Sequence, residues 1–219
     1  MNHLYIDFET LGNPPDGIVL ELSCIAFSFD EHTKFENLVD TGIKIRFDID
    51  SQKKRGRIAS KGAIDFWKKQ DPELIKQMFK SDEPKSTIEE GIKIFNDYCS
   101  KHKIDPWKST AWCRGQSFDF PMLVSLLSAT YGIVDTFDVE PVKFWNQRDT
   151  RTFIAGITGD INKKNIPILK SEVPGFIAHD SIHDCAKDII MIKKGIRMVA
   201  GEPIEWPEDE SEYVESTLR

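Results

Sequence analysis

The chain has 219 residues, of which 40% are hydrophobic and 30% are charged, and it carries 14 Phe and 5 Trp. This composition supports a hydrophobic core and excludes a disordered or fibrous chain, and the length favours a single domain. No apolar run reaches the roughly 18 residues of a membrane helix, and the first residues lack the pattern of a signal peptide. We therefore expect a cytoplasmic protein with no membrane partner.

The net charge of −7 is unevenly distributed along the chain. Residues 202–219 carry seven acidic residues against one arginine, whereas residues 1–201 carry 29 acidic and 28 basic residues. We expect residues 1–201 to form one domain and residues 202–219 to form an acidic, solvated and mobile tail. The four cysteines lack CxxC spacing, so we expect them to be buried and reduced.

The hydrophobic pattern alternates between strands and helices in the manner of an α/β protein. Strands are predicted over residues 4–9, 20–29 and 35–48, followed by helices over residues 63–69, 72–80 and 87–101. In the last of these helices, Ser86 and Glu89 are placed as a capping box. The pattern next predicts a short strand at 110–113 and a helix from about Asp119, with Pro121 in its first turn. It then predicts a strand at 144–149, a loop at 156–175 and a final helix at 181–200.

Two carboxylates are predicted to lie side by side on the first strand. Strand periodicity places Asp7 and Glu9 on one face, with Ile6 and Phe8 on the other. Because neighbouring carboxylates repel each other, a bound divalent cation such as Mg²⁺ or Mn²⁺ would remove a penalty. The alternative is a strand with one solvated face.

A third carboxylate, Asp119, is predicted at a junction between a strand and a helix. Asp is favoured as a helix N-cap, which is the structural interpretation of this position. Such a junction also projects a side chain at the carboxyl end of a strand, where α/β proteins place their functional sites.

The start of the final helix offers two pairs with the spacing His-x4-Asp, namely His183 with Asp188 and His179 with Asp184. Ser181 and Asp184 are predicted to form a capping box, which places His183 in the first helical turn. Asp188 borders the apolar stripe of this helix, whereas His179 precedes the helix, so we prefer His183 with Asp188. The stripe consists of Cys185, Ile189, Ile192, Ile196 and Val199.

Four carboxylates and one imidazole together are the composition of a two-metal phosphodiester hydrolase. In such sites two cations about 3.5–4 Å apart bind the attacking and leaving oxygens of an in-line displacement.

The order of these motifs resembles the DEDD superfamily of 3′→5′ exonucleases, in its histidine subclass. The matching positions are Asp7, Glu9, Asp119, His183 and Asp188, which span most of the chain. Residues 65–70, 105–109, 143–149 and 178–185 are similar, more narrowly, to the exonucleases of T-even bacteriophages.

The resemblance implies a ribonuclease H-like fold, with a mixed five-stranded sheet flanked by helices on both faces. It also implies that Asp7, Glu9, Asp119 and Asp188 hold two Mg²⁺ or Mn²⁺ ions and that His183 is the general base. The implied activity is 3′→5′ hydrolysis of single-stranded DNA, in preference to RNA, to nucleoside 5′-monophosphates. The implied location is the cytoplasm of the host, if the protein is encoded by a phage.

Several residues are candidates for contact with the substrate. In the family, the residues after the DxE motif contact the terminal nucleotide, which points to Thr10 and Leu11; an ordinary strand end is the alternative for these two residues. A compact basic run and a nearby aromatic residue could bind a single-stranded backbone, although a solvated loop and a core residue are the alternatives. These residues are Lys53, Lys54, Arg55, Arg57 and Trp67.

Two other functions are open at this stage. An exoribonuclease of the ribonuclease T or oligoribonuclease type would use the same site, because recognition of the 2′-OH depends on local contacts. A non-catalytic nucleic-acid-binding module is the second alternative, although such a module is expected to lack one or more metal ligands.

Overall fold

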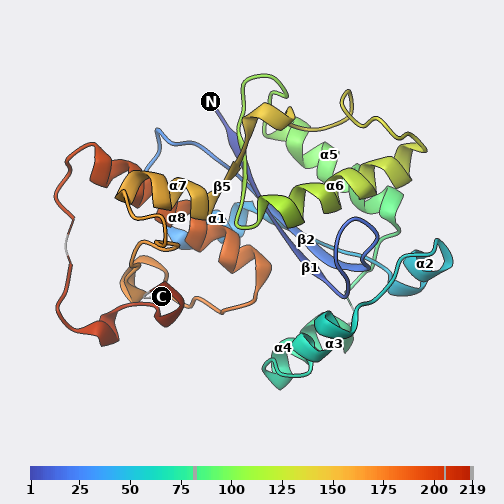
Figure 1. Cartoon of the computed structure of the whole chain (residues 1–219), viewed down its shortest axis with the longest axis horizontal. Helices are drawn as coiled ribbons and strands as arrows, with labels where there is room; N and C mark the ends of the chain where they lie inside the picture. The colour runs from blue at the N-terminus through green and yellow to red at the C-terminus, as the bar shows by residue number, and fades with distance from the viewer. Residues whose placement is uncertain (81–82, 205, 218–219) are drawn as a thin grey trace.

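A computed structural model describes residues 1–80, 83–204 and 206–217. Its centre is a five-stranded sheet with the strand order β3-β2-β1-β4-β5 (Figure 1). The strands are β1 (His3–Thr10), β2 (Val19–Phe27), β3 (Ile43–Arg46), β4 (Ala111–Cys113) and β5 (Gln147–Asp149). β1 pairs antiparallel with β2 and parallel with β4, so the sheet is mixed, as predicted.

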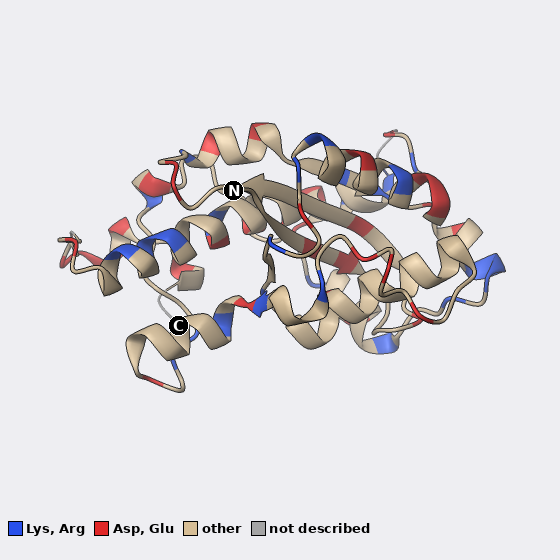
Figure 2. Ribbon diagram, turned by 90° about the horizontal axis from the view of Figure 1, so that it is seen from above, with Lys and Arg blue, Asp and Glu red and all other residues tan. Residues whose placement is uncertain are grey.

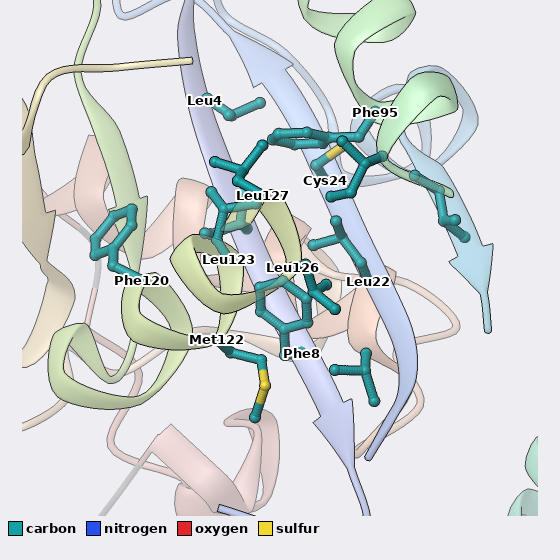
Figure 3. Close-up of a cluster of buried hydrophobic side chains, with 14 of the residues drawn as sticks. Leu4, Phe8, Leu22, Cys24, Phe95, Phe120, Met122, Leu123, Leu126 and Leu127 are labelled. Carbon is teal, nitrogen blue, oxygen red and sulfur yellow. The ribbon is translucent and has the colours of Figure 1, made fainter. Parts of the chain in front are cut away.

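Helices cover both faces of this sheet (Figure 1). One face packs against α5 (Ile88–Lys101) and α6 (Gln116–Tyr131), and the other against α1 (Phe35–Thr41), α7 (Thr150–Thr158) and α8 (Ser181–Val199). Alternation along β1 explains the two cores: Leu4, Ile6 and Phe8 point toward α5 and α6, whereas Tyr5 packs toward α8. Figure 3 shows the first of these cores, where Leu123, Leu126 and Leu127 of α6 meet the sheet.

A smaller unit extends from one end of the sheet. It contains α2 (Ile49–Lys54), α3 (Lys61–Trp67) and α4 (Pro72–Lys80), which lie apart from the two main layers in Figure 1. Trp67, Leu74 and Met78 of this unit form an apolar cluster with Leu20 of β2. Trp67 is 3% exposed, and its indole N–H donates to the carbonyl oxygen of Thr10 at 2.9 Å. This unit therefore contacts β1 at the residue that directly follows the DxE motif.

Some predicted elements differ from the structure. The strand predicted over 35–48 is a helix, α1, followed by the four-residue β3, because Phe35 and Leu38 lie at helical spacing and are both buried. α2 and α7 were not predicted, and α7 occupies the beginning of the region expected to be a loop. The strand predicted over 144–149 is a 3₁₀ turn (Phe144–Asn146) followed by β5.

The helix starts also differ in detail. α5 is capped by Thr87 with Glu90, and α8 by Asp180, one residue away from the predicted positions. α6 begins at Gln116, so Pro121 lies beyond its first turn and Asp119 lies within that turn instead of at the N-cap.

The last part of the acidic tail packs against the body of the protein. Tyr213, Val214 and Thr217 are buried, and the backbone N–H of Val214 donates to the carbonyl oxygen of Ile168 at 2.8 Å. This corrects the expectation of a solvated end for these residues, because the acidic run also contains apolar side chains that can join the core. Glu205 and Arg219, which were counted in the tail, lie outside the described residues.

All four cysteines are buried and free, as expected. Within residues 1–80, 83–204 and 206–217, no helix has the length and apolar character needed to cross a membrane.

Candidate active site

Asp7 and Glu9 lie on the face of β1 that meets α8. Both carboxyl groups have a pKa well above the usual range, first because burial disfavours their charged forms. Nearby carboxylates add to this shift, with Asp119 as the largest contributor for Asp7 and Asp184 for Glu9. The two side chains are therefore crowded by negative charge, which is an unfavourable arrangement unless a cation is present.

Asp119 reaches this cluster from the first turn of α6. It is 4% exposed, and its Oδ1 accepts a hydrogen bond from the backbone N–H of Phe8 at 3.3 Å. Burial raises the pKa of the Asp119 carboxyl to about 7, although hydrogen bonds from the backbone and the charge of Arg151 act in the opposite direction. The parallel pairing of β1 with β4 places the start of α6 beside the DxE motif.

Asp7 and Glu9 face a cavity of about 380 Å³ between β1 and the start of α8, and Asp119 lies beside Asp7 outside the lining of this cavity. Acidic and basic side chains share its wall, together with a histidine. The lining residues are Tyr5, Asp7, Phe8, Glu9, Arg114, Arg151, Asn165, Ala178, His179, Asp184, Lys187, Asp188 and Ser216. Figure 2 shows red acidic segments within the strands of the central sheet, whereas most blue basic segments lie on the surrounding helices and loops.

Asp188 lies in this cavity, but its carboxylate is occupied by other side chains. It accepts from Arg114 Nε and Nη2 at 2.7 and 2.8 Å and from the Tyr5 hydroxyl at 2.6 Å. Burial alone would raise the pKa of Asp188, but the charge and hydrogen bonds of Arg114 outweigh burial and hold it below the usual range. Asp188 is thus neutralised by an arginine within the protein.

His183 does not line the cavity. Its Nδ1 accepts from the backbone N–H of Ile177 at 3.0 Å, and its ring packs edge-on against Phe35 with centroids 5.4 Å apart. A second aromatic ring, that of Phe176, lies at 6.4 Å. Burial lowers the pKa of His183. These contacts are typical of a packing residue at the start of a helix.

The alternative pair, His179 and Asp184, lies in the cavity. Asp184 Oδ2 accepts from the backbone N–H of His179 at 3.0 Å, and its Oδ1 accepts from Lys187 Nζ at 2.6 Å. His179 has a φ of 63°, in the left-handed region, and its exposed ring meets the ring of Phe66 edge-on with centroids 5.6 Å apart. Such a backbone conformation is uncommon for a non-glycine residue and is frequent at functional sites.

A buried network fixes the start of α8 relative to the sheet. Glu21 lies opposite Glu9 in the pairing of β1 with β2 and is 1% exposed. Its carboxylate accepts from the Ser181 hydroxyl and, at 2.9 Å, from Arg46 Nε. Ser181 is the first residue of α8, so this network determines where His179 and Asp184 lie relative to Glu9.

Five residues in or beside this site were not predicted from the sequence: Tyr5, Glu21, Arg114, Arg151 and Lys187. Tyr5 had a detectable signal, because strand periodicity places it on the face of Asp7. Arg114 directly follows β4, at the strand end where functional residues gather in α/β proteins. Glu21 meets Arg46 and Ser181, which are distant in the chain, and Arg151 lies on α7, which was not predicted. Lys187 pairs with Asp184 one helical turn earlier on α8, so the spacing of these two residues was a detectable signal.

The structure separates the residues proposed for substrate binding. Thr10 lines a second cavity, of about 360 Å³, on the other side of Glu9, together with Phe66 and Phe118. Leu11 packs against the apolar cluster that contains Trp67. Trp67 also lines the second cavity, although it is only 3% exposed.

The basic run of residues 53–57 lies outside both of these cavities. Lys53 pairs with Asp50 and Arg55 pairs with Glu89, whereas Lys54 is exposed on α2. Arg57 is 8% exposed and donates to the backbone carbonyls of Gly17 and Pro15. Arg57 therefore stabilises a loop.

In the part of the chain that the structure describes, no three His, Cys, Asp or Glu side chains form a ready-made set of ligands around one point. The donor set is nevertheless of the type that hard divalent cations prefer, because carboxylates from β1 and α8 line one cavity and the carboxylate of Asp119 on α6 interacts with both Asp7 and Glu9. A cation there would offset the burial and repulsion that raise the pKa values of Asp7 and Glu9.

Comparisons with known proteins identify the family to which the chain belongs. Residues 2–194 match the 3′-5′ exoribonuclease Rv2179c-like domain, and the chain belongs to this family of 3′-5′ exonucleases. It is 48% identical over 205 residues to an exodeoxyribonuclease of Enterobacteria phage T4, covering 90% of this chain and 89% of the relative.

Solved structures show the same ribonuclease H-like fold at low sequence identity. Cell-death related nuclease 4 superimposes with a TM-score of 0.56 at 13% identity, over 90% of this chain and 64% of that chain. Exonuclease I superimposes with a TM-score of 0.53 at 10% identity, over 90% of this chain and 44% of that chain.

Proposed function

We propose that the protein is a metal-dependent 3′→5′ exonuclease that hydrolyses single-stranded DNA to nucleoside 5′-monophosphates in the cavity beside β1. The observation that carries the proposal is that carboxylates from β1 and α8 line one cavity, with a histidine at its wall, while Asp119 of α6 lies near enough to Asp7 to raise its pKa. The phage relative named an exodeoxyribonuclease supports DNA as the substrate. The exoribonuclease named in the family description supports RNA, which is the second candidate.

Asp7, Glu9, Asp119 and Asp184 are the residues proposed to hold two Mg²⁺ or Mn²⁺ ions. Asp184 replaces Asp188 in our assignment, because the oxygens of Asp188 already accept three hydrogen bonds and face a guanidinium. Bound divalent cations would lower the pKa of a water molecule and stabilise the negative charge on the leaving 3′-oxygen.

His179 replaces His183 as the proposed general base. Its side chain lines the cavity and is exposed, whereas the ring of His183 is packed against aromatic side chains. A base must reach the proton that it removes, so position has priority over the intrinsic basicity of the two imidazoles. His179 would accept the proton of the attacking water and hold it on its ring as the phosphodiester bond breaks.

The fixed position of His179 is consistent with this role. Its backbone N–H is bound by Asp184, and Asp180, the following residue, caps α8 by accepting from the backbone N–H of His183. These two hydrogen bonds hold the loop before α8 on the helix that carries Asp184. The base and one proposed ligand therefore move as a single unit.

The test uses single-stranded DNA and RNA of one sequence, labelled at the 3′ or the 5′ end, with Mg²⁺ and with a chelator. Metal-dependent shortening from the 3′ end that is lost in Asp7→Ala supports the proposal, and the ratio of the DNA and RNA rates decides between the two substrates. Binding of either strand without cleavage would instead indicate a non-catalytic binding module.

A further inference from the structure

The wall of the main cavity carries three cationic side chains, and they differ in their partners. Arg114 is paired with Asp188 at 2.7 Å, and Lys187 is paired with Asp184 at 2.6 Å. Arg151 lines the same cavity, yet it forms no ion pair with any of the residues that the structure describes. An arginine beside several carboxylates would ordinarily pair with one of them, so its lack of a partner requires an explanation.

Arg151 lies close to the proposed catalytic carboxylates. A Cβ atom built on Gly115 would lie 3.9 Å from Nη1 of Arg151 and 3.5 Å from Oδ2 of Asp119, so both side chains border Gly115. Among the described residues, the one hydrogen bond of the Arg151 side chain runs from Nη1 to the backbone carbonyl oxygen of Arg114. Since a guanidinium has five N–H donors, most of the donors of Arg151 have no partner within residues 1–80, 83–204 and 206–217 and can bind a ligand in the cavity.

The carbonyl group that orients Arg151 belongs to a residue that is itself fixed. The side chain of Arg114 is bound at two points by Asp188, and its Nη1 donates to Asn165 Oδ1 at 2.8 Å. The helix that carries Arg151 is also anchored, because its N-cap Asp149 accepts from the backbone N–H groups of Thr152 at 2.8 Å and Gln116 at 3.2 Å. The free guanidinium is therefore held on a rigid frame.

We propose that Arg151 binds the non-bridging phosphate oxygens of the nucleotide that occupies this cavity, with Arg114 and Asp188 as positioning residues. This inference rests on the proposed function, which supplies a phosphodiester as substrate and a nucleoside 5′-monophosphate as product. Guanidinium groups bind phosphate through two parallel hydrogen bonds, which an ammonium group cannot do. Phosphate also explains why Arg151 is left unpaired: the adjacent carboxylates are needed for cations.

The experiment measures the binding of a nucleoside 5′-monophosphate, and of the same nucleoside without phosphate, to the full chain in Mg²⁺ by calorimetry. Arg151→Gln is expected to weaken monophosphate binding about 10- to 100-fold, the range for hydrogen bonds to a charged group. It should leave nucleoside binding unchanged. Arg151→Lys should recover part of the affinity, because the charge remains and the fork is lost. The kcat/KM of the exonuclease reaction should be highest for the unmodified protein, lower for Arg151→Lys and lowest for Arg151→Gln.

Arg148→Gln is the matched control. Arg148 lies three residues earlier, donates to the backbone carbonyls of Trp145 and Gln147, and does not line the cavity. Its replacement should leave both affinities unchanged.

The inference fails if Arg151→Gln binds the monophosphate as tightly as the unmodified protein, or if the nucleoside and the monophosphate lose affinity equally. An equal loss would show that Arg151 only supports the shape of the cavity. These outcomes are separate from failure of the proposed function, in which the unmodified protein itself would not cleave DNA or RNA.

Discussion

The two carboxylates at the start of α8, Asp184 and Asp188, should respond in opposite ways to replacement by asparagine. Asp188→Asn removes the charge that neutralises Arg114, which is only 23% exposed, and disturbs hydrogen bonds of 2.6 to 2.8 Å. Breaking a buried pair in this way costs about 3–5 kcal/mol. Because Arg114 retains some contact with solvent, we expect a loss of free energy of unfolding near the lower limit, about 3 kcal/mol.

For a protein of this length, that loss corresponds to a decrease in Tm of roughly 6–12 °C. Asp184→Asn relieves repulsion with Glu9 but also deprives Lys187 of its partner, so the two effects oppose each other and Tm should change less. The functional effects should be reversed. Asp184→Asn should abolish exonuclease activity and the increase in Tm caused by Mg²⁺, whereas Asp188→Asn should retain that increase.

Thermal unfolding followed by circular dichroism, in chelator and in Mg²⁺, measures both quantities on the same samples. The reasoning is refuted if Asp188→Asn melts with the unmodified protein and no longer responds to Mg²⁺, while Asp184→Asn still responds. Asp188 would then be the metal ligand, and its pairing with Arg114 would be secondary.

Three further outcomes are expected. His179→Ala should lower kcat by about 10²- to 10⁴-fold, the typical contribution of a positioned base, and His183→Ala should mainly lower Tm; equal kcat values would contradict the assignment. The second outcome concerns pH in the presence of chelator. A carboxyl group whose pKa is higher in the folded protein than in the unfolded chain lowers the free energy of unfolding as the pH rises from the unfolded pKa to the folded pKa. The free energy of unfolding should therefore decline between about pH 4 and pH 7, by up to about 1.4 kcal/mol per pH unit for each such group. Asp119→Asn should show a shallower decline in urea unfolding, and identical slopes would exclude this residue as a source. Trp67→Phe should lose about 1 kcal/mol through its hydrogen bond to Thr10 with KM for single-stranded DNA unchanged, whereas an increased KM would restore Trp67 as a substrate contact.

Much of the fold could be predicted because its elements have strong local patterns. β1 and β2 are apolar and bounded by turns, and the apolar stripe of α8 begins with fully buried Cys185, Ile189 and Ile192. The predictions were wrong where the apolar pattern was short. α1 has seven residues and α2 has six, too few for helical and strand periods to be distinguished.

The local sequence also determined which carboxylates face the cavity from β1. The two-residue period of a strand places Asp7 and Glu9 together whatever surrounds them. The sequence also placed Asp119 at a strand-to-helix junction, because a short apolar strand precedes it and an apolar helix follows it. These features depend on neighbours in the chain, so the sequence alone was sufficient.

Only the tertiary structure distinguished the two His-x4-Asp pairs. They have the same spacing, and the local pattern favoured His183 with Asp188, because Asp188 borders the apolar stripe and His179 precedes the helix. The difference comes from partners far away in the chain: Arg114 and Tyr5 occupy Asp188, and Phe35 covers His183. A helix dictates the spacing of its own side chains, but the elements packed against it decide which of those side chains remain free to bind a ligand.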